Sequence, residues 1–531
     1  MKTSRVLVFL TVVVLLCLIT ACNTEKIDPD EVVERGKDDV NKSDFPIVDE
    51  PITLNVFAGK SSVNSGVDWN DLLVWNEYED MTNVQVDWNE QVGIGNIGEK
   101  RVLAMSSGET PDVFFASQLS NNELYRYGKH GVFIPLNDLI DEYAPNLKKL
   151  MDKNPSIKSG MTFPDGHIYA MPYIVDNDFL SMRIGERPWV DQSWLERVNM
   201  DMPKTTEEFY QFLKEVKKVD DDIIPYGGVG MDGLVSWISG AFGLNLNGDE
   251  FVDLPTDNGS DLRFIPTSPE YREMLEYIHK LYDEGLIDDE IYSIEWEQYI
   301  AKASDGTYAS TVFQDPASAF NMPGFESASA LEGPNGDQMY TGVASPLASN
   351  GQFVITNENP NPAATVRWLD YFYSDEGSRM MYMGVEGETY HEEDGEFVYN
   401  DEITESDQPE KQISQYMPWV GINSPGLVKE KYYTGVETSD ASLESADKIE
   451  PYVPENIWPE LTYTKDETSV LASKGMDVEK YAGEMRDKFI AGMEKLDDST
   501  WEEYIETLED MGLNEYMEAR QTAYERYADN R

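Results

Sequence analysis

From residue 52 onward, short apolar strand patterns alternate with helical patterns, and this alternation is the strongest constraint on the fold. The stretch ITLNVFAG (52–59) alternates and ends at a glycine, as a strand entering a loop does. A helical pattern (71–78), a second strand pattern VQVDWNE (84–90) and a helix, turn and buried strand (100–117) follow. Strands that alternate with helices predict an α/β fold with parallel strands, whose ligands gather at the carboxyl ends of the strands.

The length and charge of the chain narrow its architecture and its partners. With 531 residues the chain is too long for one ordinary core, so we expect two or more lobes. The formal net charge of −59 argues against nucleic acid as a partner and against adhesion to anionic lipid by charge. It also disfavours polyanionic ligands.

The first 22 residues, MKTSRVLVFLTVVVLLCLITAC, hold both cysteines of the chain. Lys2 and Arg5 precede an apolar run over 6–19, which has the length of a signal segment and is short for a membrane span. LITAC resembles the bacterial lipobox, which implies a lipoprotein signal peptide over 1–21 and a lipidated Cys22. The alternative is an ordinary secretory signal with an incidental cysteine. No later stretch is apolar enough for a transmembrane helix, so we expect a lipid anchor on the extracytoplasmic face of the cell membrane.

The remaining composition disfavours a cofactor or a metal. Residues 22–50 are charged and poor in large apolar side chains, which is typical of a flexible tether. Cys22 is the only thiol of the mature chain, so we expect the mature chain to have no disulfide and no thiolate metal site. The four histidines show no HExxH spacing. We therefore expect no cofactor and no metal.

Three helices carry clear boundary signals. In PKTTEEFYQFLKEVKKV (203–219), Thr205 or Thr206 is the expected N-cap. In SPEYREMLEYIHKLYDEGL (268–286), Ser268 caps the helix and Gly285 ends it. Near the C-terminus, Gly512 ends a helix whose apolar face begins at Trp501.

Five segments in order together resemble the family 1 solute-binding proteins of bacterial ABC importers, the type that includes maltose-binding protein. Within that family they are most similar to the large oligosaccharide-binding lipoproteins. The segments are DGHIYAMPY, MPKTTEEFYQFLKEVKK, YREMLEYIHKLYDEGLIDDEIY, ATVRWLDYFYSDEGSRMMYMGVEGETY and TWEEYIETLEDMGLNEYMEARQTAYERY. They span most of residues 52–528.

The resemblance implies two α/β lobes, a hinge, an interlobe ligand cleft and extra C-terminal helices. By analogy, one lobe holds 51–168 and 346–390, and the other holds 169–345 and 391–531. The implied partners are an oligosaccharide and the permease subunits of an ABC transporter, and we expect a monomer. The sequence does not name the sugar.

One segment departs from the family pattern. Many relatives carry a glycine-bearing calcium loop just after the TTEEF helix, where this chain has VDDDIIPYGG (219–228). Calcium needs six to eight oxygens around a bent loop, and Asp220, Asp221 and Asp222 alone cannot surround it. We interpret them as a solvated loop. TDNGSD (256–261) is interpreted as a turn.

Candidate ligand-binding residues follow from what a sugar cleft needs, which is aromatic platforms and polar side chains at strand ends. Trp237 lies among small residues in GLVSWISGAFG, and Trp419 lies in the loop-like YMPWVGIN. Both are candidate platforms. Gln118 and Asp315 follow predicted strands and are candidate polar contacts.

Three functions remain open from the sequence alone. The first is a binding protein that captures oligosaccharide and delivers it to a permease. The second is a secreted polysaccharide-acting enzyme, a glycosidase or a lyase, although no nucleophile elbow, P-loop or dinucleotide fingerprint is present. The third is a structural surface lipoprotein, which does not require the two-lobed α/β pattern.

Overall fold

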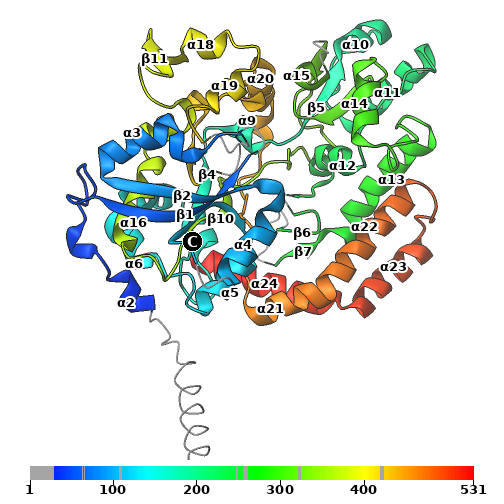
Figure 1. Ribbon diagram of the computed structural model, residues 1–531. Coiled ribbons are helices and arrows are strands. Elements are labelled where there is room, and N and C mark those ends of the chain that lie inside the picture. Colours follow the sequence, from blue (N-terminus) through cyan, green and yellow to red (C-terminus); the bar gives the residue numbers. More distant parts are fainter. Residues whose placement is uncertain are drawn as a thin grey trace, which may run out of the picture.

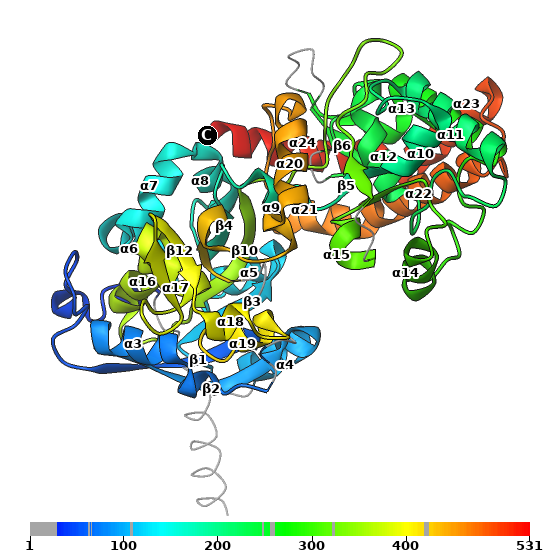
Figure 2. The same ribbon diagram turned by 90° about the horizontal axis from the view of Figure 1, so that it is seen from above.

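The computed structural model describes residues 29–61, 64, 66–106, 110–246, 249–254, 261–320, 324–418 and 424–531. Two lobes lie side by side, with the C-terminal helices along one side of the molecule (Figures 1 and 2). This arrangement confirms the predicted periplasmic-binding-protein-like class. Among the described helices, none is long and apolar enough to cross a membrane.

The first lobe is built on a six-stranded sheet in the order β13-β4-β10-β3-β1-β2. Strands β1 and β2 are parallel, as are β1 and β3, whereas β10 runs antiparallel to both β3 and β4. The sheet is therefore parallel, as predicted, except for β10. Its strands are β1 (Ile52–Lys60), β2 (Val84–Gly93), β3 (Val113–Leu119), β4 (Met171–Val175), β10 (Leu347–Ile355) and β13 (Gly426–Val428).

Helices cover both faces of this sheet, and tryptophans fill the space between sheet and helices. Trp69 and Trp88 meet edge to face with ring centroids 5.1 Å apart, and Trp75 lies 5.7 Å from Trp368 on α16. All four are core residues rather than surface rings. The principal helices of this lobe are α3 (Leu73–Thr82), α4 (Ile97–Ser106), α5 (Asn121–Lys129), α6 (Asn137–Tyr143), α7 (Pro145–Lys153), α8 (Pro155–Met161), α16 (Pro362–Asp370) and α17 (Asp375–Met383).

The second lobe has a smaller sheet in the order β8-β5-β9, with all pairings antiparallel. Isolated parallel bridges extend it beyond β8 through residues 224–227 and 287. Its strands are β5 (Arg187–Asp191), β8 (Ser310–Phe313) and β9 (Phe325–Ser327), and its helices include α10 (Gln192–Val198), α11 (Thr206–Val219), α12 (Asp232–Ser239), α13 (Pro269–Asp283), α14 (Trp296–Ser304) and α15 (Pro316–Phe320).

The C-terminal helices pack against the second lobe and reach the first. Val478, Phe489 and Tyr516 belong to the core of the second lobe. At the other end of this region, the Thr462 hydroxyl donates to the Thr162 carbonyl of the first lobe at 3.0 Å. The helices are α20 (Asp440–Ile449), α21 (Lys465–Val470), α22 (Met476–Ile490), α23 (Asp498–Met511) and α24 (Leu513–Asp529).

Two expected boundaries are corrected by the packing. From residue 29 on, the predicted tether is attached to the body, because Val32 and Ile47 are fully buried in the first core and Arg35 Nη1 donates to the Asn357 carbonyl at 2.9 Å. Residues 391–418 and 424–428 also pack with the first lobe rather than the second, since Tyr399 is in the first core and β13 joins the first sheet.

Three crossover segments join the lobes and are hydrogen-bonded to one another. The first contains Arg183, the second contains Ala344 and the third contains Glu437. In the first two, the Ala344 amide donates to the Arg183 carbonyl at 2.9 Å, and Arg183 Nε donates to the Ala344 carbonyl at 2.8 Å. The Ser181 hydroxyl donates to the Glu437 carbonyl of the third at 2.7 Å. Short connections of this kind are where hinge motion between lobes is absorbed.

Candidate functional site

The directions of the strands place two loop-bearing edges opposite each other. The carboxyl end of β4 leads into the first crossover, so the carboxyl ends of the parallel strands β1 and β3 face the second lobe. In that lobe, β5 begins at the crossover, and Arg187 at its start pairs with Phe313 at the end of β8. The end of β8 therefore faces the first lobe. Figure 2 shows α15 on the side turned toward the first lobe, with α14 farther from that lobe.

The first-lobe edge carries an unusual backbone around Gln118. Ala116 and Gln118 adopt positive φ angles of 49° and 50°, which non-glycine residues rarely adopt. Arg101 holds this turn by donating to the carbonyls of Ser117, at 2.5 Å, and Gln118, at 3.3 Å. Only glycine fits at position 59 on neighbouring β1, because a Cβ there lies 2.3 Å from the Ala116 oxygen. Strained backbone of this kind concentrates at ligand sites, so Gln118 stays a proposed contact.

Asp315 lies two residues after the end of β8, near the predicted strand end, but its side chain is hydrogen-bonded within the protein. It is 1 % exposed and accepts hydrogen bonds from the Ala317 amide at 2.9 Å and the Ser318 hydroxyl at 2.9 Å. The Ser439 hydroxyl of the third crossover also donates to it, at 3.0 Å. The carboxylate thus caps α15 and ties the second lobe to a crossover. The expected ligand contact is replaced by a structural one.

The predicted platform Trp237 is a core residue. Its ring is 1 % exposed and meets Phe209 edge to face with centroids 4.6 Å apart. Its Nε1 donates to the Ser329 carbonyl at 3.0 Å. A ring that is only 1 % exposed has no free face for a sugar, so the prediction that Trp237 is a platform is wrong. Trp419 and Cys22 lie outside the described residues.

An exposed tryptophan that the sequence analysis did not select stands at the second-lobe edge. Trp296, the first residue of α14, is 50 % exposed and lies against Phe313 at the end of β8, with centroids 5.5 Å apart and an interplanar angle of 32°. Beneath it lies a small aromatic core that includes Trp189, Tyr299 and Tyr308. The sequence does contain one sign of this exposure: Trp296 lies between two charged residues, Glu295 and Glu297.

The family of the chain is decided by its sequence together with this two-lobed geometry. The sequence model of the bacterial extracellular solute-binding proteins matches residues 66–379, which is more than half of the chain. The chain belongs to this family. It is therefore a binding protein, and the enzyme alternative no longer holds, because FusA, a relative described below, is a substrate-binding protein as well.

Similar proteins cover nearly the whole of this solute-binding protein. The fructooligosaccharide ABC transporter substrate-binding protein FusA of Streptococcus pneumoniae is 29 % identical over 516 residues, covering 92 % of each chain. The solved structure of FusA with kestose has a TM-score of 0.67 at 26 % identity, and covers 90 % of this chain and 100 % of that one. Lipoprotein LipO of Bacillus subtilis is 24 % identical and covers 89 % of this chain and 92 % of LipO.

The three aspartates in the segment that replaces the family calcium loop are exposed. Asp220, Asp221 and Asp222 form a turn in which the Asp222 amide donates to Asp220 Oδ1 at 3.1 Å. In the part of the chain that the structure describes, no three His, Cys, Asp or Glu side chains gather in a way that holds a metal ion. Most of TDNGSD (256–261) lies outside the described residues. The lack of a calcium site stays a prediction.

Removing calcium is expected to change the melting temperature very little. Three adjacent carboxylates in solvent bind calcium weakly, so their occupation adds little to the stability of the folded state. The measurement is a thermal melt in buffer containing a chelator, with added calcium as the control. A large fall in melting temperature that calcium reverses contradicts the prediction and indicates another oxygen cluster.

Proposed function

We propose that this solute-binding protein captures an uncharged oligosaccharide between its lobes and delivers it to the permease of an ABC importer. The observation that carries the proposal is the half-exposed ring of Trp296 at the end of β8, on the edge that faces the β1 and β3 ends of the first lobe. A sugar ring presents apolar C–H faces to an aromatic plane and hydroxyls to polar neighbours. FusA, which binds fructooligosaccharide, supports this class of ligand.

The charge of the chain favours an uncharged ligand. With a formal charge of −59, the long-range field opposes the approach of a polyanion. A neutral sugar approaches without this repulsion.

We also propose that Cys22 anchors the protein to the outer face of the cell membrane. The lipobox-like LITAC supports this, and LipO is a lipoprotein similar along most of its length. Two acyl chains hold a protein at a bilayer, because each buried methylene contributes about 0.8 kcal/mol.

A thermal-shift panel of oligosaccharides tests the proposed ligand class. Kestose, maltotriose, xylotriose, chitotriose and trigalacturonate provide four neutral chemistries and one acidic chemistry. A ligand that binds only the folded state stabilises it by about 2.7 kcal/mol at a hundredfold excess over Kd, which raises the melting temperature by a few degrees. X-ray scattering is expected to show a more compact molecule with the sugar, because lobe closure shortens the particle. A panel without any shift contradicts the proposal.

The Trp296→Ala variant is expected to weaken sugar binding by about 1–3 kcal/mol, by analogy with the stacking of nucleobases on aromatic side chains. Its melting temperature without ligand should change little, because the ring is half exposed. Calorimetric titration gives the affinity. Phe45→Ala is the matched control, since Phe45 is also partly exposed but packs on Tyr371 in the segment before β1. Equal affinities for the two variants rule out Trp296 as a platform.

A further inference from the structure

A cavity of about 290 Å³ lies at the hinge, and we name it the hinge pocket. It is bounded by Arg183 of the first crossover, residues 341–344 of the second, the start of α12, residues 249–251, and α22 at Gly483 and Arg486. The hinge pocket thus touches two of the three crossovers and the second lobe. Any molecule bound here contacts the parts that move when the lobes close.

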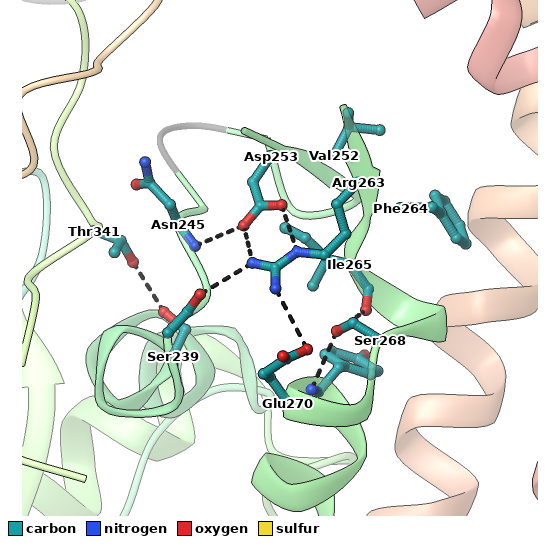
Figure 3. A network of polar contacts seen from close by, with 12 residues as sticks. Ser239, Asn245, Val252, Asp253, Arg263, Phe264, Ile265, Ser268, Glu270 and Thr341 are labelled. Carbon is teal, nitrogen blue, oxygen red and sulfur yellow. Dashed lines mark hydrogen bonds and ion pairs between the residues drawn. The ribbon is translucent and has the colours of Figure 1, made fainter. Parts of the chain in front are cut away.

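The wall of the hinge pocket formed by residues 243–246 and 249–253 is held in place by a buried ion pair. Asp253 is 1 % exposed, accepts from Arg263 Nε at 2.9 Å and Nη2 at 2.5 Å, and also accepts from the Asn245 amide at 3.0 Å (Figure 3). Arg263 also donates to the Gly243 carbonyl at 3.0 Å. Because this wall is fixed before any ligand arrives, little ordering entropy is lost on binding.

A second link ties α12, another boundary of the pocket, to a crossover. The hydroxyls of Ser239, at the end of α12, and Thr341, in the second crossover, lie 2.8 Å apart and share a hydrogen bond (Figure 3). Thr341 itself lines the hinge pocket. The pocket is thus a preformed space joined directly to the hinge.

The charged groups around the hinge pocket are of both signs. Asp232 pairs with Arg486 at 2.8 Å, and Glu250 lies 3.9 Å from the same guanidinium. Burial, together with the neighbouring Asp232, raises the pKa of the Glu250 carboxyl. Burial lowers the pKa of the Arg183 guanidinium, and no carboxylate of the described residues lies within ion-pair distance of it. Its Nε donates to the Ala344 carbonyl.

We propose that the hinge pocket receives one uncharged ring of the bound oligosaccharide. This rests on the proposed function and adds the position and chemistry of one subsite. The guanidinium of Arg183 donates to ring oxygens, and the carboxylates of Asp232 and Glu250 accept from vicinal hydroxyls. The apolar side chains of Leu246 and Phe251, which also line the pocket, meet the C–H face of the ring. A volume of about 290 Å³ lies at the lower end for ligand pockets, so only part of an oligosaccharide enters.

The carboxylates around Arg486 oppose the binding of an acidic ring. Two carboxylates already share Arg486 within 4 Å, so a uronate placed among them adds like charge in a partly desolvated space. The hinge pocket is therefore expected to discriminate between neutral and acidic sugars. Discrimination by unpaired or repelled charge is a general source of specificity.

Gly483 offers a way to fill the hinge pocket without disturbing its walls. A Cβ built on Gly483 meets no atom within 4 Å, and the residue lies inside α22, where leucine is a better helix former than glycine. We expect Gly483→Leu to keep or raise the melting temperature and to weaken binding of the tightest neutral sugar of the panel at least tenfold. Calorimetric titration measures the affinity.

Glu484→Leu is the matched control. Glu484 adjoins Gly483 on the same helix, its side chain is 52 % exposed, and its only ion pair is a surface contact with Lys480 at 3.9 Å in the described part of the chain. Such pairs contribute little to stability. We expect Glu484→Leu to bind the sugar like the unaltered protein.

The outcomes separate this inference from the proposed function. If the unaltered protein binds no sugar of the panel, the proposed function fails and the subsite fails with it. If the unaltered protein and Gly483→Leu bind the sugar equally, the function stands and the subsite is wrong.

If Gly483→Leu folds poorly, the variant Asp232→Ala tests the subsite instead. The Asp232 side chain is 62 % exposed, so its removal is compatible with folding. The variant is expected to weaken binding of the neutral sugar about tenfold, and unchanged affinity overturns the proposal. Binding of trigalacturonate by the unaltered protein more tightly than the neutral sugars also overturns it.

Discussion

Replacing Trp237 with alanine is expected to destabilise the protein by about 3–5 kcal/mol, which is the usual loss when a buried tryptophan is truncated. The ring is 1 % exposed, packs edge to face on Phe209 and donates to the Ser329 carbonyl at 3.0 Å. Truncation leaves a cavity in the core of the second lobe and removes the donor from a buried carbonyl. Both effects act on the folded state before any ligand is present.

A thermal melt of Trp237→Ala beside Trp296→Ala gives the comparison. The two substitutions remove the same side chain, but Trp296 is 50 % exposed. We expect a fall of several degrees for Trp237→Ala and a small change for Trp296→Ala, with the order reversed for sugar affinity. An unchanged melting temperature together with weakened sugar binding would restore Trp237 as a platform and contradict its burial.

The parts of the second lobe that depend on local rules were predictable. Thr205 caps α11 by accepting from the Glu208 amide, and Ser268 caps α13 by accepting from the Tyr271 amide. Gly512 ends α23 with a φ of 104°, which glycine adopts at no steric cost. A cap or a stop is decided by residues within one helical turn, so the sequence displays it directly.

The role of Trp237 was not predictable in this way, because small residues around a large ring have two meanings. From the sequence they are interpreted as the surroundings of an aromatic platform. In the structure they let segments approach closely, since a Cβ on Gly240 lies 2.1 Å from the Met339 oxygen. That approach joins residues about 100 positions apart. No local pattern reports which distant segment will cover a ring.

The corrected boundaries of the tether and of the first lobe also depend on contacts between segments that are far apart in the sequence. Strands β10 and β13 return to the first sheet after the chain has built most of the second lobe, and β13 pairs with β4 across roughly 250 residues. In the expected tether, Val32 and Ile47 belong to short apolar stretches between charged residues. Their burial depends on a partner surface, to which Arg35 also binds through the Asn357 carbonyl. Periodicity cannot show such contacts.

The variant Cys22→Ser is expected to lose the membrane anchor almost completely. Lipidation at a lipobox forms a thioether on the cysteine sulfur, and serine offers no thiol. Without acyl chains, the contribution of about 0.8 kcal/mol per buried methylene is lost. The variant should appear in the soluble fraction, or keep its signal segment uncut. Fractionation of cells and labelling with a lipid precursor measure the change.

Cys17→Ser is the matched control, because it removes the other cysteine of the chain from within the apolar run. It should leave lipidation and membrane attachment unchanged. Lipidated, membrane-bound Cys22→Ser protein contradicts the anchor. Released protein is not expected to return to the bilayer by charge: loss of Lys2 and Arg5 with the signal takes the formal charge from −59 to −61, and anionic lipid repels such a chain. For a protein this acidic, the proposed attachment to the membrane therefore requires a lipid at Cys22 rather than attraction to the membrane surface.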